Sequence, residues 1–117
     1  MAVYYKEDEM VFKNLSDMNR TELVPGFHVK FIHSERMTFA YWDVLAGAVL
    51  PEHTHPHEQV VNMVEGEFQL TVDGEAKIMK EGDVAMIPPN APHSAKALTD
   101  CKIIDVFAPV REDYLDK

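Results

Sequence analysis

Short runs of β-branched and aromatic residues, separated by turn-forming residues, recur along most of this sequence. Hydrophobic residues almost nowhere recur at the 3.6-residue period of an α-helix, whereas short runs bounded by Gly, Pro, Asn and Asp are typical of β-strands. The pattern therefore predicts an all-β domain, built as a sandwich or a barrel. We expect strands at residues 26–33, 37–46, 59–66, 67–74, 75–82, 84–88, 93–98 and 101–109.

A turn signal in the middle of the chain predicts which two of these runs pair. Asp73-Gly74 suits a two-residue hairpin turn, because both central positions of such a turn favour a positive φ angle. We therefore expect residues 67–72 to pair with residues 75–80.

Length and composition favour a single domain. The chain has 117 residues, and a hydrophobic content of 46% is enough to bury one core of ordinary size. The first residues are mostly polar, so we expect an N-terminal arm or edge strand at residues 1–24 and a single domain at residues 25–117. The single cysteine, Cys101, lies in an apolar run and is expected to act as a small buried hydrophobic residue.

The charge of the chain excludes some classes of partner. There are 20 acidic and 11 basic side chains, giving a formal net charge of −9, which repels phosphate backbones and anionic lipid surfaces. We expect neither nucleic acid nor a membrane as a partner, and an anionic small molecule would need a local positive centre. Residues 1–10 carry charges where a secretory signal has its apolar run, which favours a cytoplasmic protein.

Histidines are concentrated in the segment PEHTHPHEQ, residues 51–59. In an extended chain the side chains at alternate positions share one face, so His53, His55 and Gln59 could converge on one point. Imidazole nitrogens are common ligands of divalent transition metals, and a carboxamide oxygen can complete such a set. The alternative is a solvated loop whose histidines make ordinary hydrogen bonds.

A further ligand should come from a different strand. His93 is suitably placed, because PPNAPH brings it directly after a tight turn to the start of an expected strand. His57 and Glu58 are weaker candidates, since Pro56 can turn the chain before His57 and Glu58 has the opposite parity. Three histidines and Gln59 would bind one divalent ion, Ni, Zn, Fe, Mn or Cu, and these neutral ligands would leave its positive charge available to an anionic substrate.

One carboxylate lies in the middle of an apolar strand. In CKIIDVFAP the side chains of Ile103, Asp105 and Phe107 share one face of the expected strand. Burial of a lone carboxylate is costly, so Asp105 should meet a metal, an arginine, a hydrogen-bond donor or a cavity. The alternative is an aspartate that faces water at a frayed edge.

An arginine follows this strand, near the expected rim of the domain. Arg111 has a planar group that could bind a carboxylate through two parallel hydrogen bonds. The alternative is an ion pair at the surface with Glu112 or Asp113.

Two segments of the sequence resemble the two cupin motifs. GAVLPEHTHPHEQVVNMVEG resembles the first motif, with Gln59 in place of the usual Glu, and GDVAMIPPNAPH resembles the second. Asn90 and Ala97 stand where the second motif usually has Gly and Asn, and Asn adopts left-handed conformations more easily than most residues. The resemblance implies a jelly-roll β-barrel with a metal site in its mouth.

The C-terminal segment indicates which group of cupins the sequence resembles. IIDVFAPVREDYL, together with the two histidine segments, resembles the KdgF-type cupins of pectin and alginate breakdown, which convert 4,5-unsaturated monouronates into linear keto acids. The resemblance implies metal binding by His53, His55, Gln59 and His93. It also implies active-site roles for three further residues, with proton transfer by Asp105, substrate orientation by Arg111 and a pocket wall formed by Phe107.

Cupin folds carry several functions, so other classes remain open. A metal-dependent oxygenase, a sensor or binding module for sugar acids, and a structural cupin without tightly held metal are the alternatives to an isomerase. Apolar side chains on both faces of strands such as KIIDVFA also favour a homodimer.

Overall fold

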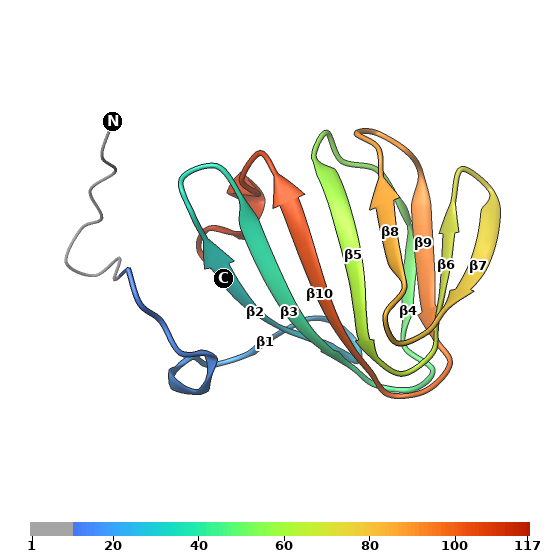
Figure 1. The fold of residues 1–117 in the computed structure, drawn as a ribbon, viewed down its shortest axis with the longest axis horizontal. Helices are drawn as coiled ribbons and strands as arrows, with labels where there is room; N and C mark the ends of the chain where they lie inside the picture. The colour runs from blue at the N-terminus through green and yellow to red at the C-terminus, as the bar shows by residue number, and fades with distance from the viewer. Residues whose placement is uncertain (1–10) are drawn as a thin grey trace.

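The computed structural model describes residues 11–117, which form two antiparallel β-sheets (Figure 1). Residues 1–10 of the expected N-terminal arm lie outside the described residues. The strands are β1 (Thr21–Val24), β2 (Phe27–His33), β3 (Thr38–Val44), β4 (Val49–His53), β5 (Glu58–Glu65), β6 (Phe68–Val72), β7 (Glu75–Met79), β8 (Val84–Ile87), β9 (His93–Ala97) and β10 (Cys101–Ala108). Short 3-10 helices precede β1 and follow β10, as η1 (Leu15–Asp17) and η2 (Glu112–Tyr114). No helix among residues 11–117 is long and apolar enough to span a membrane.

The strand order in each sheet shows how the core is enclosed. One sheet has the order β1-β2-β3-β10-β5-β8 and the other has the order β4-β9-β6-β7. From β3 onward the chain crosses repeatedly between the sheets (Figure 1). Side chains of both sheets form a common core. The predicted all-β class is therefore confirmed.

The predicted hairpin is also confirmed. Strands β6 and β7 pair in antiparallel register, from Phe68 opposite Met79 to Val72 opposite Glu75. The turn between them contains Asp73-Gly74, whose φ angles of 49° and 80° are those that a primed hairpin turn requires.

The expected strands do not include β4, whose sequence VLPEH contains a proline. Proline has no amide hydrogen to donate and is therefore rare within a sheet, except on an edge strand. Strand β4 lies at the edge of the four-stranded sheet, with β9 as its neighbour. Pro51 is therefore compatible with the strand that leads to the first histidine.

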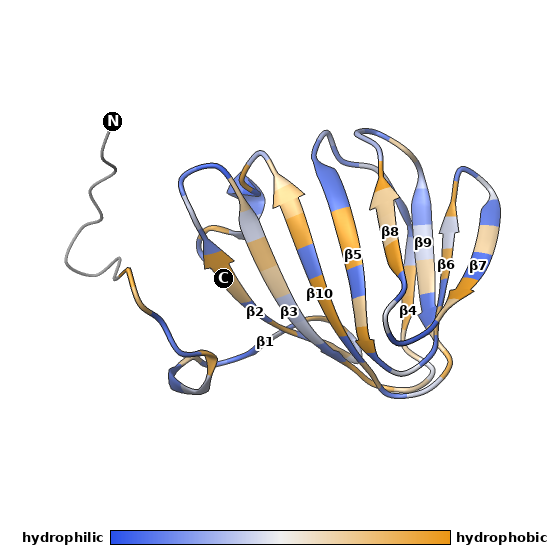
Figure 2. Ribbon diagram, viewed as in Figure 1, coloured by the Kyte–Doolittle hydropathy of each residue, from blue (hydrophilic) through white to orange (hydrophobic). Residues whose placement is uncertain are grey.

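Alternation along the strands separates the core from the outer faces. Residues Cys101, Ile103, Asp105 and Phe107 of β10 are buried, whereas the residues between them are more exposed. Figure 2 shows hydrophilic bands that interrupt hydrophobic stretches of β10 and β5. Strand β10 lies between β3 and β5, so its inward side chains occupy the middle of the six-stranded sheet.

Apolar side chains also form a row on the outer face of this sheet. The register places Phe39, Val106, Val60 and Met86 side by side on β3, β10, β5 and β8. Met86, at the edge of the sheet, is 76% exposed. The homodimer that such a face favours stays a prediction.

A close approach of two segments depends on one glycine. Gly66, between β5 and β6, has a φ angle of 96°, and a Cβ atom there would overlap the carbonyl oxygen of Asp100. The same Cβ atom would lie 2.9 Å from both Cys101 Sγ and Thr99 Oγ1. Gly82 has a similar φ angle of 87°, but no atom lies within 4 Å of its Cβ position. The two positions therefore separate backbone strain from steric overlap.

We expect Gly66→Ala to lower the free energy of unfolding by roughly 3 kcal/mol or more, because a left-handed conformation and a clash with backbone both add cost. Gly82→Ala should cost only about 1 to 2 kcal/mol, from the backbone conformation alone. Equilibrium unfolding in urea measures both values. Equal losses in the two variants would contradict the close approach at Gly66.

Candidate metal centre

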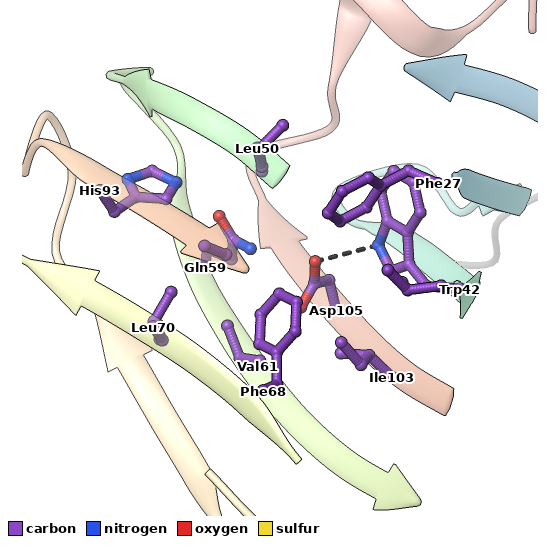
Figure 3. A pocket seen from close by; sticks show the side chains of 12 residues that line it. Phe27, Trp42, Leu50, Gln59, Val61, Phe68, Leu70, His93, Ile103 and Asp105 are labelled. Carbon is purple, nitrogen blue, oxygen red and sulfur yellow. Dashed lines mark hydrogen bonds between the residues drawn. The ribbon is translucent and has the colours of Figure 1, made fainter. Parts of the chain in front are cut away.

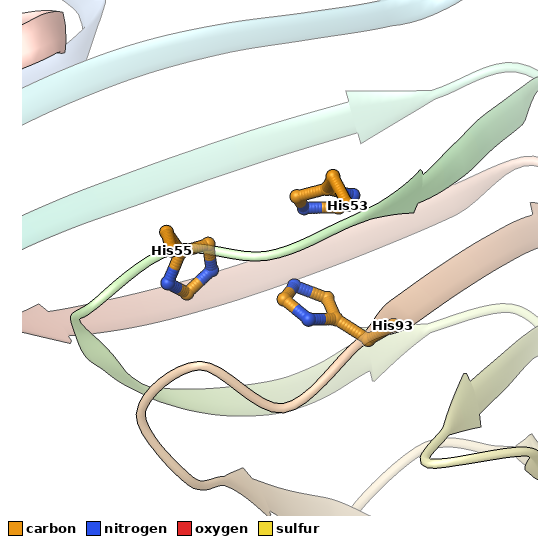
Figure 4. A group of neighbouring side chains, drawn as sticks. All are labelled: His53, His55 and His93. Atoms are coloured by element: carbon orange, nitrogen blue, oxygen red, sulfur yellow. The ribbon is translucent and has the colours of Figure 1, made fainter.

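Three histidines meet where β4 and β9 lie side by side. His53 ends β4, His55 lies in the loop that follows, and His93 begins β9, directly opposite His53 in the antiparallel register. Each side chain offers one nitrogen, and these three nitrogens lie within 4.8 Å of one another. Figure 4 shows the three rings gathered between the strand ends. The structure therefore brings together all three histidines that the sequence predicts as ligands.

Hydrogen bonds to the backbone fix the orientation of each ring. The Nδ1 atom of each of the three histidines lies 2.9 to 3.0 Å from a backbone carbonyl oxygen. The carbonyl groups belong to Pro51, His57 and Ala91. A carbonyl oxygen can only accept, so Nδ1 must carry the hydrogen and donate it. In the neutral rings the lone pair then lies on Nε2, where a metal could bind.

The Nε2 atoms have surroundings that suit a cation. His93 Nε2 is buried and has no hydrogen-bond partner among the described residues. His55 Nε2 lies 3.0 Å from Gln59 Oε1, and both atoms are acceptors when Nδ1 carries the hydrogen. Ligand atoms about 2.1 Å from one ion, at neighbouring octahedral positions, are also about 3 Å apart. These residues therefore fit a divalent metal ion.

Burial keeps the rings of His55 and His93 neutral. It lowers the pKa of His55 to about 4, and the nearby positive charge of Arg111 acts in the same direction. Burial also lowers the pKa of His93. Both rings therefore present an unprotonated nitrogen at neutral pH, as metal ligation requires.

Gln59 reaches the site by a different route from the one expected. The prediction of one extended chain through residues 53–59 is wrong, because β4 ends at His53 and β5 begins only at Glu58. Gln59 is buried because it lies on the inward face of β5, opposite Phe107 of β10. Glu58 is exposed on the other face. The two sheets, and not one strand, bring the amide oxygen to the histidines.

A tight turn delivers His93 to the site. Asn90 has a φ angle of 67°, which confirms the left-handed conformation expected where the second motif usually has Gly. Its backbone amide donates to the carbonyl oxygen of His55 at 2.8 Å, and the Ala91 amide donates to the Pro88 carbonyl oxygen at 3.2 Å. The segment with the first two histidines is thus linked directly to the turn that positions the third.

The Asp105 side chain is buried in a cavity between the sheets. It accepts a hydrogen bond from Trp42 Nε1 through Oδ2 at 3.0 Å, and its Oδ1 has no partner among the described residues. Gln59 and His93 line the same cavity, and Figure 3 shows Gln59 between His93 and Asp105, with its amide oxygen on the His93 side. Burial raises the pKa of Asp105 to about 7, although Gln59, Trp42 and Arg111 act in the opposite direction. This carboxyl group can therefore gain or lose a proton near neutral pH.

Arg111 is both buried and paired. Its side chain contacts Asp113 through two hydrogen bonds, from Nε to Oδ1 at 3.0 Å and from Nη2 to Oδ2 at 2.7 Å. The guanidinium carbon lies 4.8 Å from the centre of the Phe107 ring and 4.1 Å from that of Tyr114. The ion pair considered from the sequence is thus present with Asp113. Burial and stacking nevertheless hold the guanidinium group against the wall of the site.

Phe107 links this arginine to the histidines. Its ring lies 5.6 Å from the His55 ring, in an edge-on orientation, and the side chain is buried. Phe107 is followed two residues later by Pro109, after which the chain turns into η2. The predicted residues of the C-terminal segment thus lie beside the histidine cluster.

Two residues in this region were not predicted from the sequence. Trp42 donates to Asp105, and Tyr114 stacks on Arg111. The signal for Trp42 is its indole hydrogen, which needs an acceptor when it is buried, and Asp105 is the acceptor in an apolar strand. No comparable signal marks Tyr114, because its place depends on the path of the chain after β10.

The arrangement of the sheets and the histidines is that of a cupin. The Cupin domain family matches residues 40–107, more than half of the chain, and the chain therefore belongs to the cupin family. This result and the two antiparallel sheets confirm the predicted jelly-roll fold.

Similar proteins include two KdgF proteins. The chain is 27% identical over 117 residues to the pectin degradation protein KdgF of Dickeya dadantii (strain 3937), covering 98% of this chain and 100% of the relative. KdgF from Halomonas sp. has a similar structure, with a TM-score of 0.85 and 29% identity, covering 91% of this chain and 99% of that one. An RmlC-like cupin from Shewanella frigidimarina has a TM-score of 0.86 and 30% identity, covering 91% and 96%. The predicted resemblance to KdgF-type cupins is confirmed.

We expect His93→Ala to weaken binding of a divalent transition metal by more than about 100-fold, beyond the 10- to 100-fold that outer partners contribute. His57→Ala should leave the affinity nearly unchanged, because His57 supports His55 through its backbone carbonyl. Titration of the metal-free variants by calorimetry measures both affinities. Equal losses in the two variants would argue against ligation by His93.

Proposed function

We propose that this protein is a metal-dependent enzyme that converts 4,5-unsaturated monouronates, as released from pectin or alginate, into linear keto acids. The observation that carries the proposal is the buried Asp105 carboxyl group, which shares one cavity with Gln59 and His93. A group that exchanges protons thus lies next to a candidate metal site, as an isomerase of this kind needs. Similarity to the KdgF proteins along almost the whole chain supports the same substrate class.

The metal would be held by the three histidines and Gln59. A divalent ion held there would polarise substrate oxygen atoms and supply positive charge. The backbone around the site orients these ligands, because each imidazole ring is fixed by a hydrogen bond from its Nδ1 to a carbonyl group. The net charge of the chain is −9, so a local positive centre is what an anionic sugar acid requires.

The reaction needs proton transfers at two stages. Ring opening breaks the bond between C1 and the ring oxygen, moves the hydrogen of the C1 hydroxyl group to that oxygen and leaves an aldehyde and an enol. Ketonisation then moves the enol hydrogen to C4, so the product is an isomer of the substrate. Asp105 is suited to carry these protons, since its pKa of about 7 allows both protonation states near neutral pH.

Arg111 and Phe107 would bind and orient the substrate. The Nε and Nη2 atoms of Arg111 are engaged by Asp113, so its Nη1 group and the remaining hydrogen of Nη2 are the donors left for a substrate carboxylate. Phe107 and Tyr114 stack on the guanidinium group and limit its movement. Phe107 would also supply an apolar wall beside the sugar ring.

We expect Asp105→Asn to lower kcat by about 100-fold or more, the scale of a lost general acid or base, while metal content stays at the level of the unmodified protein. The loss of ultraviolet absorbance from the conjugated double bond of a freshly made unsaturated monouronate measures the rate. Metal analysis of the same samples separates a chemical defect from a lost ion.

Other results would favour the other classes. Decay of absorbance at the uncatalysed rate with metal-loaded, unmodified protein would refute the isomerase. Binding of the uronate without turnover would then indicate a sensor, and oxygen uptake on addition of substrate would indicate an oxygenase.

We expect Arg111→Lys to raise KM by about tenfold or more, because lysine cannot reproduce the planar, stacked group that orients a carboxylate. The change in kcat should be smaller, and metal content should not change. Steady-state kinetics over a range of uronate concentrations measures the two constants. An unchanged KM would exclude Arg111 from substrate binding.

A further inference from the structure

The contact between Trp42 and Asp105 crosses two neighbouring strands diagonally. In the register of β3 with β10, Trp42 lies opposite Ile103, and Asp105 lies opposite Ala40. The indole Nε1 nevertheless reaches Asp105 Oδ2 at 3.0 Å. Diagonal neighbours in a sheet are within reach of an aromatic side chain, and Ala40 has too small a side chain to stand between them.

Aromatic neighbours hold the indole ring in this orientation. The ring of Phe27 packs edge-on against Trp42, with centroids 5.8 Å apart and an interplanar angle of 87°. The ring of Phe31 packs in a similar way at 6.2 Å and 79°. Trp42 and Phe27 also line the cavity that contains Asp105 (Figure 3). The indole hydrogen therefore has a fixed direction.

We infer that Trp42 is a positioning residue, which holds Oδ2 of Asp105 so that Oδ1 is the atom that exchanges protons with the substrate. The role in proton transfer rests on the proposed function. An indole nitrogen can only donate, so it binds Oδ2 whether or not the acid is ionised. Oδ1 is buried and has no hydrogen-bond partner among the described residues, so it is the oxygen left free for the substrate.

The proton balance follows from this arrangement. In the acid form the carbonyl oxygen is the better acceptor, so Oδ2 faces Trp42 and Oδ1 carries the hydrogen. Oδ1 gives that hydrogen to the ring oxygen, which leaves a carboxylate, and the carboxylate takes the hydrogen of the C1 hydroxyl group as the aldehyde forms. In ketonisation Oδ1 gives this hydrogen to C4 and takes the hydrogen of the enol hydroxyl group, so Asp105 returns to its acid form. The hydrogen bond from Trp42 to Oδ2 persists in both states, so the carboxyl group does not rotate between the steps.

Nuclear magnetic resonance tests the contact without any enzyme assay. Trp42 is the single tryptophan of the chain, so the protein gives one indole N–H resonance. We expect Asp105→Ala to move this resonance upfield, because it removes the acceptor. Asp43→Asn should move it much less, since Asp43 lies on the other face of β3 and pairs with Lys102. If Asp105→Ala does not fold, Asp105→Asn should move the resonance in the same direction by a smaller amount.

Kinetics test the positioning role. Trp42→Phe keeps an aromatic ring but removes the donor, and we expect kcat to fall by at least about tenfold, part of what general acid-base catalysis contributes. KM and metal content should stay within about twofold of those of the unmodified protein. A general loss of structure would instead change KM and metal content together with kcat. Asp43→Asn should leave kcat unchanged.

Two results would overturn the inference. An indole resonance that Asp105→Ala does not move would refute the contact, and a Trp42→Phe protein with unchanged kcat would refute the positioning role. If the unmodified protein shows no turnover, the proposed function fails and the proton-transfer role fails with it. A resonance that moves in Asp105→Ala would in that case still establish that Trp42 binds Asp105.

Discussion

The candidate metal centre depends on three hydrogen bonds between histidine rings and backbone carbonyl groups. Each bond places the hydrogen on Nδ1 and leaves Nε2 free, so the direction of every ligand atom is fixed by the path of the chain. Strand β4, the turn before β5 and the turn before β9 provide these carbonyl groups. The fold thus orients the rings through its backbone, and the inward face of β5 adds Gln59 from the other sheet.

The distribution of charge around this centre suits the anionic substrate that we propose. The chain is strongly acidic, yet the buried rings of His55 and His93 and the amide of Gln59 are neutral. Among residues 11–117, Asp105 is the one carboxyl group that lines the cavity beside them, and burial favours its protonated form. Arg111 adds a positive charge that Phe107 and Tyr114 hold at the edge of the site. These features support a site in which a sugar acid would meet positive charge and a proton carrier together.

Local chemistry made part of this structure predictable from the sequence. Asp73-Gly74 predicts its hairpin, because the turn alone demands positive φ angles. The position of His93 at the start of a strand could also be predicted, because the proline-rich turn PPNAPH precedes it. The way in which Gln59 reaches the site could not be predicted. Alternate residues share a face only within one strand, and β4 ends at His53, before β5 begins at Glu58. The contact of Trp42 with Asp105 depends on the pairing of segments 63 positions apart, which local patterns do not reveal.

Diffraction from crystals grown with a divalent transition metal, recorded at its absorption edge, tests the centre most directly. The hydrogen bonds described here predict one strong anomalous peak, about 2.0 to 2.2 Å from Nε2 of His53, His55 and His93 and from Oε1 of Gln59. A metal ion coordinated by Nδ1 atoms, or the absence of a peak between the three rings, would contradict a metal centre whose rings are oriented by these carbonyl groups.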